Sequence, residues 1–327
     1  MNTAVALILF RRPEPTARVF ERIREARPAK LFLIADGPRP GNSDDETGCE
    51  RARSVVERVD WPCEVVRDFA DANLGLKCRI PSGLDRVFDE VESAIVLEDD
   101  CLPHPSFFPY CDELLERYRE DERVVHISGS QLLTDPPSRA SYHFSRYTHI
   151  WGWATWRRAW SLFDVSLTDW HAASRAERRQ RLRRLFENAD ERRHWRFVWD
   201  HSHEVDNWDG QWSYVPLSRD LLAVSPNRNL VSNIGFGDEA TNATADPLGI
   251  ADRPAEGISF PLEHPAEMRR DAAADAQASE FFRRPVHLQN ELVAGLFRAG
   301  GRVLDFVPEP IRPKIRHRDR VGGPDSG

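Results

Sequence analysis

Short apolar runs alternate with amphipathic segments over the first 130 residues, and no other feature constrains the fold as strongly. Each run has the length of a buried strand, and the segments between the runs have apolar residues at helical spacing. The runs are residues 4–10, 31–35, 63–67, 94–97 and 124–127, and the segments are 16–26, 49–59, 82–91 and 106–118. This alternation predicts an α/β fold with a mainly parallel sheet flanked by helices.

Polar residues follow three of the predicted strands. In doubly wound parallel sheets, ligands bind beyond the carboxyl ends of the strands. The residues at these ends are Arg11 and Arg12, then Asp36 and Gly37, and finally Glu98, Asp99 and Asp100. We therefore expect a ligand site at this edge of the sheet.

The acids Glu98, Asp99 and Asp100, called the acidic triplet below, directly follow the apolar run 94–97. Three adjacent carboxylates at a strand end repel one another unless a cation or hydrogen-bond donors compensate their charge. A hard divalent ion bound by one or two carboxylates and by substrate phosphates is the usual solution. A solvated turn is the alternative, and the residues alone leave both interpretations open.

Three further candidates come from loops. Asp36 precedes Gly-Pro, which is also ordinary turn chemistry. Lys77 follows the loop 73–76, where a lysine could meet phosphates or remain solvated. Asp209 lies between Trp208 and Trp212, and such surroundings can exclude water and raise the basicity of a carboxylate. A solvated acid at the edge of the core is the alternative for Asp209.

Two other patterns favour a structural interpretation. His201 and His203 resemble a metal-binding pair, but no third ligand follows at a recognisable spacing, so we interpret them as a polar surface segment. The tryptophans of residues 151–160 could stack on a sugar, although such clusters more often belong to a core.

Composition excludes several classes of protein. The formal net charge of −8 argues against a nucleic-acid binder, which needs a basic surface. No apolar run approaches the ~20 residues of a membrane-spanning helix, and residues 4–10 are too short for a signal peptide. The five cysteines form no Cys-x-x-Cys pair, which favours a reducing compartment. We therefore expect a cytoplasmic protein.

The stretch from residue 73 to residue 110 resembles a known family. An apolar strand, Glu-Asp-Asp, a proline and then Phe-Phe-x-Tyr opening a helix occur in the same order around the metal-binding triplet of N-acetylglucosaminyltransferase I and its bacterial relatives. Residues 151–160, 208–209 and 231–237 also resemble a bacterial group of family-2-like sugar transferases. The resemblance covers roughly residues 3–245. It implies the GT-A fold, a nucleotide-diphospho-sugar transferase architecture.

The resemblance also implies an activity, namely metal-dependent hexosyl or N-acetylhexosaminyl transfer, as in polysaccharide biosynthesis. Asp100 would coordinate Mn²⁺ or Mg²⁺, and Glu98 and Asp99 would contact the donor sugar and ribose. The donor would be a nucleotide-diphospho-sugar, with UDP as the expected nucleotide. The acceptor would be a glycan, a lipid-linked sugar or a protein.

The remaining candidates take roles from the same resemblance. Arg12 and Asp36 would lie at the nucleobase, and Lys77 would be available to the phosphates. Asp209 would be the catalytic base of an inverting displacement. The relatives have Trp-Asp-Asp-Trp where this chain has Trp-Asp-Gly-Gln-Trp, and a histidine near the position of Asn242.

Four segments follow from this interpretation. Residues 1–130 would form the nucleotide-sugar-binding half of one domain, and residues 131–250 its acceptor-side half. Residues 251–310 would form a helical extension, and residues 311–327 a disordered basic tail. The amphipathic stretch 288–297 and the tail 312–320 could contact the inner face of a membrane peripherally.

Two alternatives to sugar transfer remain. A sugar nucleotidyltransferase would also use an α/β core and a carboxylate-bound metal, but it would favour a glycine-rich phosphate loop after the first strand. Residues 10–15 contain no glycine, which counts against it. The other alternative is a non-catalytic module that binds a nucleotide sugar.

Overall fold

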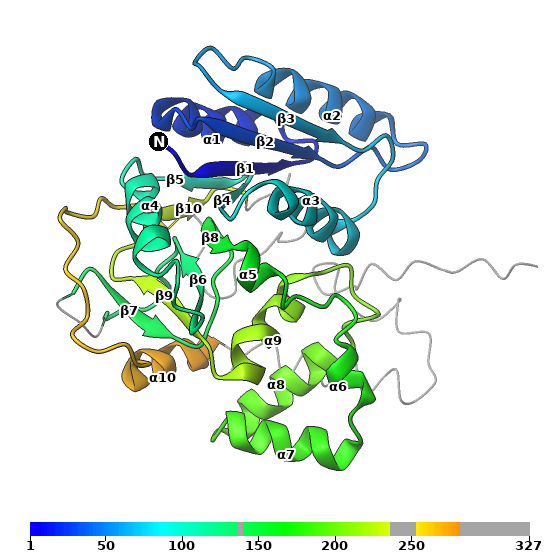
Figure 1. The fold of residues 1–327 in the computed structure, drawn as a ribbon. Helices are drawn as coiled ribbons and strands as arrows, with labels where there is room; N and C mark the ends of the chain where they lie inside the picture. The colour runs from blue at the N-terminus through cyan, green and yellow to red at the C-terminus, as the bar shows by residue number, and fades with distance from the viewer. Residues whose placement is uncertain (137–139, 236–252, 282–327) are drawn as a thin grey trace, which may run out of the picture.

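The computed structural model describes residues 1–136, 140–235 and 253–281, and these form an α/β fold around one large sheet (Figure 1). The sheet has eight strands in the order β3-β2-β1-β4-β8-β6-β9-β7. Its strands are β1 (Ala4–Leu9), β2 (Lys30–Ala35), β3 (Glu64–Phe69), β4 (Ser93–Glu98), β6 (Val124–Ser128), β7 (Tyr142–Ser145), β8 (Trp153–Trp156) and β9 (Leu222–Pro226). A separate antiparallel pair joins β5 (Cys101–Pro103) and β10 (Val231–Asn233).

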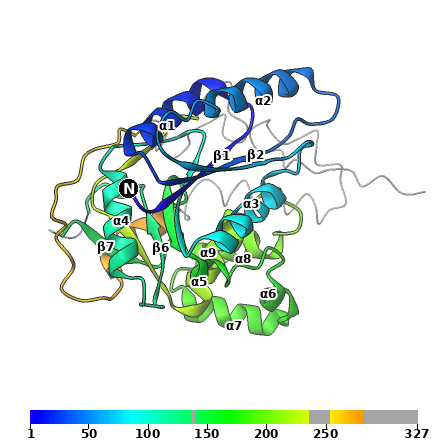
Figure 2. The ribbon, with the colours of Figure 1, turned by 45° about the horizontal axis from the view of Figure 1, so that its top comes forward.

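Helices cover both faces of the sheet. They are α1 (Pro13–Ala26), α2 (Ser43–Val56), α3 (Leu76–Glu90), α4 (Phe107–Arg117), α5 (Arg157–Trp160), α6 (Thr168–Ala172), α7 (Arg175–Leu185), α8 (Ala189–Asp200), α9 (Asp209–Arg219) and α10 (Ala272–Phe281). Seen from the top of the molecule, α1 and α2 lie on one side of β1 and β2, and α3 lies on the other (Figure 2). The predicted fold class, an α/β sheet flanked by helices, is therefore confirmed.

The first four strands have the order that begins a doubly wound nucleotide-binding fold. β3, β2, β1 and β4 are all parallel, with β1 paired to β2 on one side and to β4 on the other. The order of connection reverses between β1 and β4, and such a switch point opens a crevice at the carboxyl ends of the strands. The acidic triplet and residues 10–12 both lie at this end of the sheet because Glu98 ends β4, Asp99 and Asp100 follow it, and residues 10–12 follow β1.

Strands β7 and β8 run antiparallel to the other strands of the large sheet. β8 is antiparallel to both β4 and β6, and β7 is antiparallel to β9. β6 therefore points the same way as β4, and β9 is parallel to β6. The carboxyl ends of β1, β4, β6 and β9 consequently share one edge of the sheet.

The core forms two apolar layers because alternate residues of each strand face opposite sides. In β1, Val5, Leu7 and Leu9 pack with the side of α1, α2 and α4, whereas Ala6 and Ile8 pack with α3, α5 and α9. Both layers are fully buried, which explains why these strands appear in the sequence as continuous apolar runs.

Helix α2 begins earlier than its apolar spacing predicts. The spacing indicates residues 49–59, but the helix spans Ser43–Val56. The side chain of Asn42 caps the helix by accepting a hydrogen bond from the Asp45 amide at 3.1 Å, and acids fill the first turn. Capping by polar residues therefore sets this start, and apolar periodicity does not detect it.

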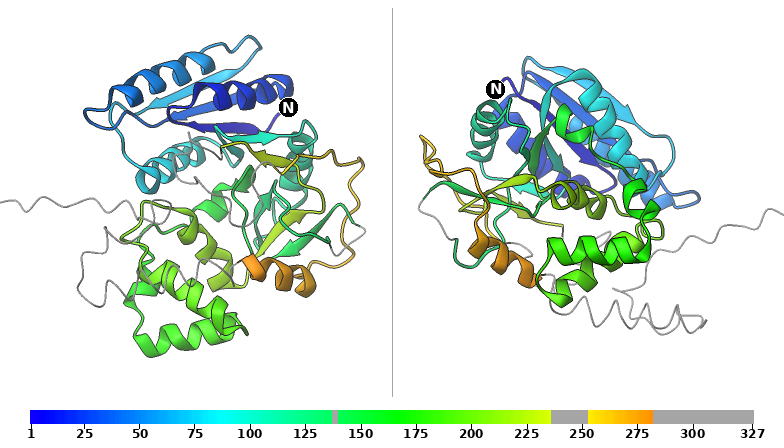
Figure 3. Two further views of the ribbon diagram at one scale, coloured as in Figure 1. Left: turned by 180° about the vertical axis from the view of Figure 1, so that it is seen from behind. Right: turned by 60° about the horizontal axis from the view of Figure 1, so that its bottom comes forward.

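A third apolar cluster joins the helical region formed by α6, α7, α8 and α9, which gather at one end of the molecule (Figure 3). Trp170, Trp195 and Trp199 are buried there, together with Ala274 and Ala278 of α10. Helix α10 thus falls within the predicted extension 251–310. The stretch 288–297, the residues near Asn242 and the tail 311–327 lie outside the described residues.

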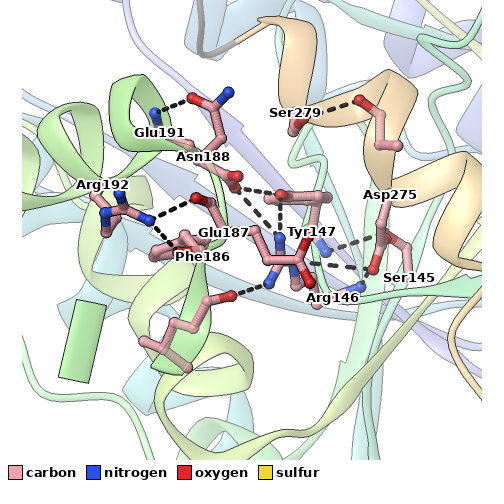
Figure 4. Close-up of polar contacts among 12 residues, drawn as sticks. Ser145, Arg146, Tyr147, Phe186, Glu187, Asn188, Glu191, Arg192, Asp275 and Ser279 are labelled. Carbon is pink, nitrogen blue, oxygen red and sulfur yellow. Dashed lines mark hydrogen bonds and ion pairs between the residues drawn. The ribbon is translucent and has the colours of Figure 1, made fainter. Parts of the chain in front are cut away.

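A buried charge network also holds α10 to this region (Figure 4). Arg146 forms ion pairs with Glu191 of α8 at 3.5 Å and with Asp275 of α10 at 3.9 Å. Ser145 donates a hydrogen bond to Asp275 at 2.7 Å, and Tyr147 donates one to Glu191. Both carboxylates are nearly inaccessible to solvent, so each needs its partners to remain charged.

In the part of the chain that the structure describes, no helix combines the length and apolar character needed to cross a bilayer. The five cysteines all lie in the described residues and are free thiols.

Candidate functional site

Arg12 joins the ends of β1 and β4. Its Nη2 atom donates to Asp99 Oδ1 and lies 3.0 Å from Asp100 Oδ2. The backbone amide of Phe10 donates to the other oxygen of Asp99 at 3.2 Å. Asp99 is buried and partnered at both oxygens, so within the chain it ties the loop after β1 to the loop after β4.

The acidic triplet carries more negative charge than Arg12 compensates. Burial, with the charges of Asp100 and Asp99, raises the pKa of Glu98 to about 8, and Arg12 opposes this rise. Burial also raises the pKa of Asp99. Three carboxylates facing one guanidinium leave a formal surplus of two negative charges when all are ionised. Such a surplus favours the binding of a cation.

The segment after β10 lies directly against Asp100. The Ile234 amide donates to the Asp100 carbonyl at 2.9 Å, and Asn233 Oδ1 accepts from the Gly235 amide at 2.9 Å. A Cβ atom on Gly235 would overlap Asp100 Oδ2 and would lie 2.6 Å from Arg12 Nη1. A side chain at position 235 would therefore displace Asp100 and Arg12 from their present positions. The resemblance included residues 231–237, but neither spacing nor hydropathy predicts this contact.

The carboxylates present fit a divalent ion that is bound together with a diphosphate. Among the described residues, no group of three or more His, Cys, Asp or Glu is arranged to hold a metal by itself. Mg²⁺ in particular usually takes one or two carboxylates and completes its shell with phosphate oxygens and water. Of the two acids paired with Arg12, Asp100 is the more exposed: 15% of its side-chain surface is accessible to solvent, against 4% for Asp99. It is therefore the better placed to be such a ligand.

The carboxylate of Asp36 accepts four hydrogen bonds. Its Oδ1 accepts from the amides of Gly37 and Leu74 at 2.9 and 2.8 Å. Its Oδ2 accepts from the Gly75 amide and the Asn73 side chain at 3.0 and 2.9 Å. This geometry makes Asp36 the anchor of the loop 73–75. Its role at a nucleobase stays a prediction.

Lys77 contacts the segment between α8 and α9. Its Nζ donates to the Ser202 carbonyl at 2.5 Å, and its amide donates to Asp206 Oδ1 at 2.9 Å. Burial lowers the pKa of Lys77. Gly75, at a φ of +78°, leaves room for the Asp206 carboxylate, which a Cβ atom there would approach to 2.6 Å. The ammonium of Lys77 thus fixes the helical region, and its contact with phosphates stays a prediction.

Asp209 is the first residue of α9. Burial raises its pKa, although the Gly210 amide donates to its Oδ1 at 2.8 Å. The negative charge of Asp209 also contributes to the raised pKa of Glu98. The flanking Trp208 and Trp212 are buried in the core. Asp209 is therefore coupled electrostatically to the triplet, and its role as a base stays a prediction.

The tryptophans of residues 151–160 belong mainly to the core. Trp153, Trp156 and Trp160 are buried, and Trp153 stacks on Trp208 at 5.7 Å between ring centroids. Trp151 is half-buried. The cluster therefore supports the helix that carries Asp209, which agrees with the structural interpretation.

His126 lies inside this cluster. It stacks on Trp153 at 5.1 Å, and its Nδ1 accepts a hydrogen bond from the indole of Trp212 at 3.1 Å. An indole nitrogen only donates, so Nδ1 carries no proton, and Nε2 donates to the His149 carbonyl at 3.1 Å. Burial lowers the pKa of His126 to about 3, and burial lowers that of His149 to about 4.

These buried histidines should make the protein less stable in mild acid. The unfolded chain binds protons near pH 6.5, while the folded chain resists them until about pH 4 or below, so the free energy of unfolding should fall as pH drops through that window. The expected slope is up to about 1.4 kcal/mol per pH unit for each histidine. Urea denaturation from pH 7.5 to 4.5 measures it, and His126→Asn should have a shallower slope. An unchanged slope in that variant would contradict the assignment.

His201 and His203 do not form a metal pair in the structure. His201 Nδ1 lies 2.9 Å from the Phe197 carbonyl, and the His203 ring packs on that of His171 at 4.1 Å. His203 is exposed. Their interpretation as a polar surface segment agrees with this arrangement.

Known proteins resemble this chain only distantly. No protein-family model and no curated protein matches it. Among solved structures it is similar to a UDP-glucose pyrophosphorylase complexed with UDP-glucose (14% identity, 44% of this chain and 62% of that chain, TM-score 0.26). It is also similar to a cytidylyltransferase from Leptospira borgpetersenii serovar Hardjo-bovis (11%, 54% and 66%, TM-score 0.30) and to mouse xyloside xylosyltransferase 1 in its apo form (10%, 68% and 84%, TM-score 0.34). The chain therefore spans less than two thirds of the length of the first two proteins, and likeness at this level leaves the reaction undefined.

Proposed function

We propose that this protein is a metal-dependent glycosyltransferase with a GT-A fold, which moves a sugar from a nucleotide-diphosphate donor to an acceptor hydroxyl. The observation that carries the proposal is the acidic triplet at the end of β4, paired with Arg12 from the loop after β1. Asp209 is a carboxylate with a raised pKa whose charge acts on Glu98. A base and a cation site near each other are what a direct displacement at a sugar requires.

Asp100 is the residue that would hold Mn²⁺ or Mg²⁺. When bound, the ion would stabilise the negative charge that develops on the leaving nucleotide diphosphate. Arg12 holds Asp99 and Asp100 in place by its two hydrogen bonds. Glu98 would face the donor sugar and ribose. The resemblance assigns the same role to Asp99, but Arg12 and the Phe10 amide occupy its two oxygens, so Asp99 would act by holding Arg12 and the loop after β1. Asp36 would support the nucleobase side through the loop that it anchors.

Asp209 would act as the general base. It would accept the proton of the acceptor hydroxyl while that oxygen forms a bond to the anomeric carbon. The bond from the same carbon to the diphosphate oxygen breaks, and the nucleotide diphosphate leaves with the electron pair. Attack from the face opposite the leaving group inverts the anomeric centre, and burial makes Asp209 a stronger base than an exposed carboxylate.

A sugar nucleotidyltransferase fits the site less well. Such an enzyme needs phosphate-binding groups after β1, and this segment contains no glycine before α1 begins at Pro13. Arg12, the cation at this position, is already paired with two carboxylates.

We propose UDP as the nucleotide, a cytoplasmic location and peripheral contact with a membrane, as the sequence suggests.

A panel of nucleotide sugars tests the proposal. The melting temperature of the full chain is measured with each UDP-, GDP- and dTDP-sugar in the presence of Mn²⁺ or Mg²⁺. In a separate assay with the same mixtures, the release of nucleoside diphosphate is measured. We expect one donor to raise the melting temperature only with the metal and to be hydrolysed slowly. Consumption of a nucleoside triphosphate and a sugar phosphate, with release of pyrophosphate, would support the nucleotidyltransferase. Metal-dependent binding without any turnover would support the non-catalytic module.

A further inference from the structure

A polar cavity of about 550 Å³ lies apart from the triplet, at the carboxyl ends of β6 and β9. Gln131 and Leu133 follow β6, and Asn229 follows β9, while residues 253–263 form the opposite wall. These strand ends lie on the sheet edge that also carries the triplet. The volume is within the range of small-molecule sites, about 300–1,000 Å³.

Two polar side chains, those of Asn229 and Arg253, fix the walls of this cavity. Asn229 accepts from the Gln131 amide at 3.0 Å and donates to the carbonyls of Arg253 and Pro254, both at 3.1 Å. Arg253 donates to the carbonyls of Gln131 and Leu133 at 2.8 and 3.0 Å. These bonds cross-link the loops after β6 and β9 to the segment 253–263. The cavity is therefore formed before any ligand binds.

The lining is polar but carries no net charge. Two arginines, Arg228 and Arg253, are matched by Glu256 and Glu263. Arg228 and Glu256 are themselves paired at 2.7 Å. An anionic ligand such as a phosphate would find no surplus of positive charge here. The lining favours an uncharged ligand that forms many hydrogen bonds.

Both walls of the cavity carry exposed hydroxyl groups. Ser259 lies on the segment 253–263, and Thr134 lies on the opposite wall. Hydroxyl, amide and carboxylate groups that together carry no net charge match the many hydroxyl groups of a neutral sugar.

The chain connects this cavity directly to the triplet. Asn229 lines the cavity, and Gly235, six residues later, lies against Asp100. β9 is three strands from β4, which corresponds to about 14 Å at the spacing of a sheet. A ligand that reaches from the cavity to the triplet must therefore be longer than one sugar unit.

We propose that this cavity binds a neutral oligosaccharide, the part of the acceptor remote from the reacting hydroxyl. The acceptor is then a glycan, not a protein or the lipid portion of a lipid-linked sugar. This inference rests on the glycosyl transfer proposed above. The cavity sets which glycan is accepted, whereas Asp209 and the triplet perform the transfer.

Variants that fill the cavity test this inference. Ser259→Trp and, from the opposite wall, Thr134→Trp should fill it. Ser166→Trp, at an exposed position in the helical region, is the matched control. Each full-length protein is applied without nucleotide sugar to an array of neutral glycans, and the affinity for the best-bound trisaccharide is measured by calorimetry. Thermal melting confirms that each variant is folded.

We expect the wild type to bind at least one class of neutral glycan. Affinity should fall at least tenfold in the two filled variants and should not change in Ser166→Trp. Failure to bind any neutral glycan, or wild-type affinity in both filled variants, would overturn the inference. If donor turnover occurs but the filled variants keep the wild-type acceptor KM, only the cavity assignment fails. If the cavity binds glycan but no nucleotide sugar is consumed, only the proposed transfer fails.

Discussion

Replacement of Asp209 by asparagine should leave donor binding intact and reduce the rate of sugar transfer by about 10²–10⁴-fold, the usual contribution of a general base. Asparagine has nearly the same shape, and its Oδ1 can still accept the hydrogen bond from the Gly210 amide at the start of α9. The variant therefore removes the basic group without removing the contact that orients it. Donor affinity by calorimetry and transfer rate with saturating donor separate the two effects.

The pH profile gives an independent readout of the same prediction. A general base must be ionised, so the transfer rate should rise with pH through the pKa of Asp209. Burial raises that pKa, so the rise should occur above the range of an ordinary aspartate, which is about 3.9. The acidic limb should disappear from the small residual activity of Asp209→Asn.

Asp206→Asn is the matched control because Asp206 lies in the loop before α9 and accepts the Lys77 amide. It should keep most of the transfer activity, and because asparagine Oδ1 can still accept from the Lys77 amide, its thermal stability should stay close to that of the wild type. Near wild-type transfer by Asp209→Asn, with loss of transfer in Asp206→Asn, would assign the base to Asp206 and contradict our assignment. Retention of the anomeric configuration in the product would also contradict it.

Strands β1, β2 and β4 could be predicted because nearly all of their residues are buried, on both faces of the sheet; β3 is only partly buried. Val5, Leu7 and Leu9 face one apolar layer while the residues between them face the other, so the runs in the sequence are continuous. β8 was not predicted, because Trp153 and Trp156 indicate an aromatic cluster as readily as a strand. Yet β8 is the strand that separates β4 from β6. The second half of the sheet therefore depends on pairing that local patterns do not encode.

In the candidate site, too, some features could be predicted from local sequence and others depend on long-range packing. The triplet, Arg12 and Asp36 could be placed at one sheet edge because parallel strands end together. Their partners could not be predicted, because the pairing of Arg12 with Asp99 and Asp100 depends on tertiary packing. The contact of Gly235 with Asp100 likewise requires β10 to return to β5. Spacing identifies the residue types of a site, and long-range strand pairing decides their neighbours.

Replacement of Asp100 by alanine should abolish metal-dependent donor binding, with a loss of at least about a hundredfold in affinity, or ~2.7 kcal/mol. Asp99 cannot take over, since Arg12 and the Phe10 amide occupy its two oxygens and it is buried. The loss should not come from unfolding. Removal of one charge from a crowded cluster relieves repulsion on Glu98, whose raised pKa the charge of Asp100 helps to produce. The melting temperature should therefore stay close to that of the wild type.

Calorimetric titration with the donor identified in the screen, with and without Mn²⁺, measures this effect. Asp60→Asn is the matched control, because Asp60 pairs with Arg24 on the exposed surface. It should bind donor as the wild type does. Asp100→Asn should resemble Asp100→Ala in the titration, since an amide keeps the shape of the side chain but supplies no negative charge to the ion. If Asp100→Ala keeps the Mn²⁺-dependent affinity, the surplus charge of the triplet does not hold a metal through Asp100. Glu98 would then be the carboxylate to test, because it is the remaining acid of the triplet and a bound cation would offset the burial and the negative charges that raise its pKa.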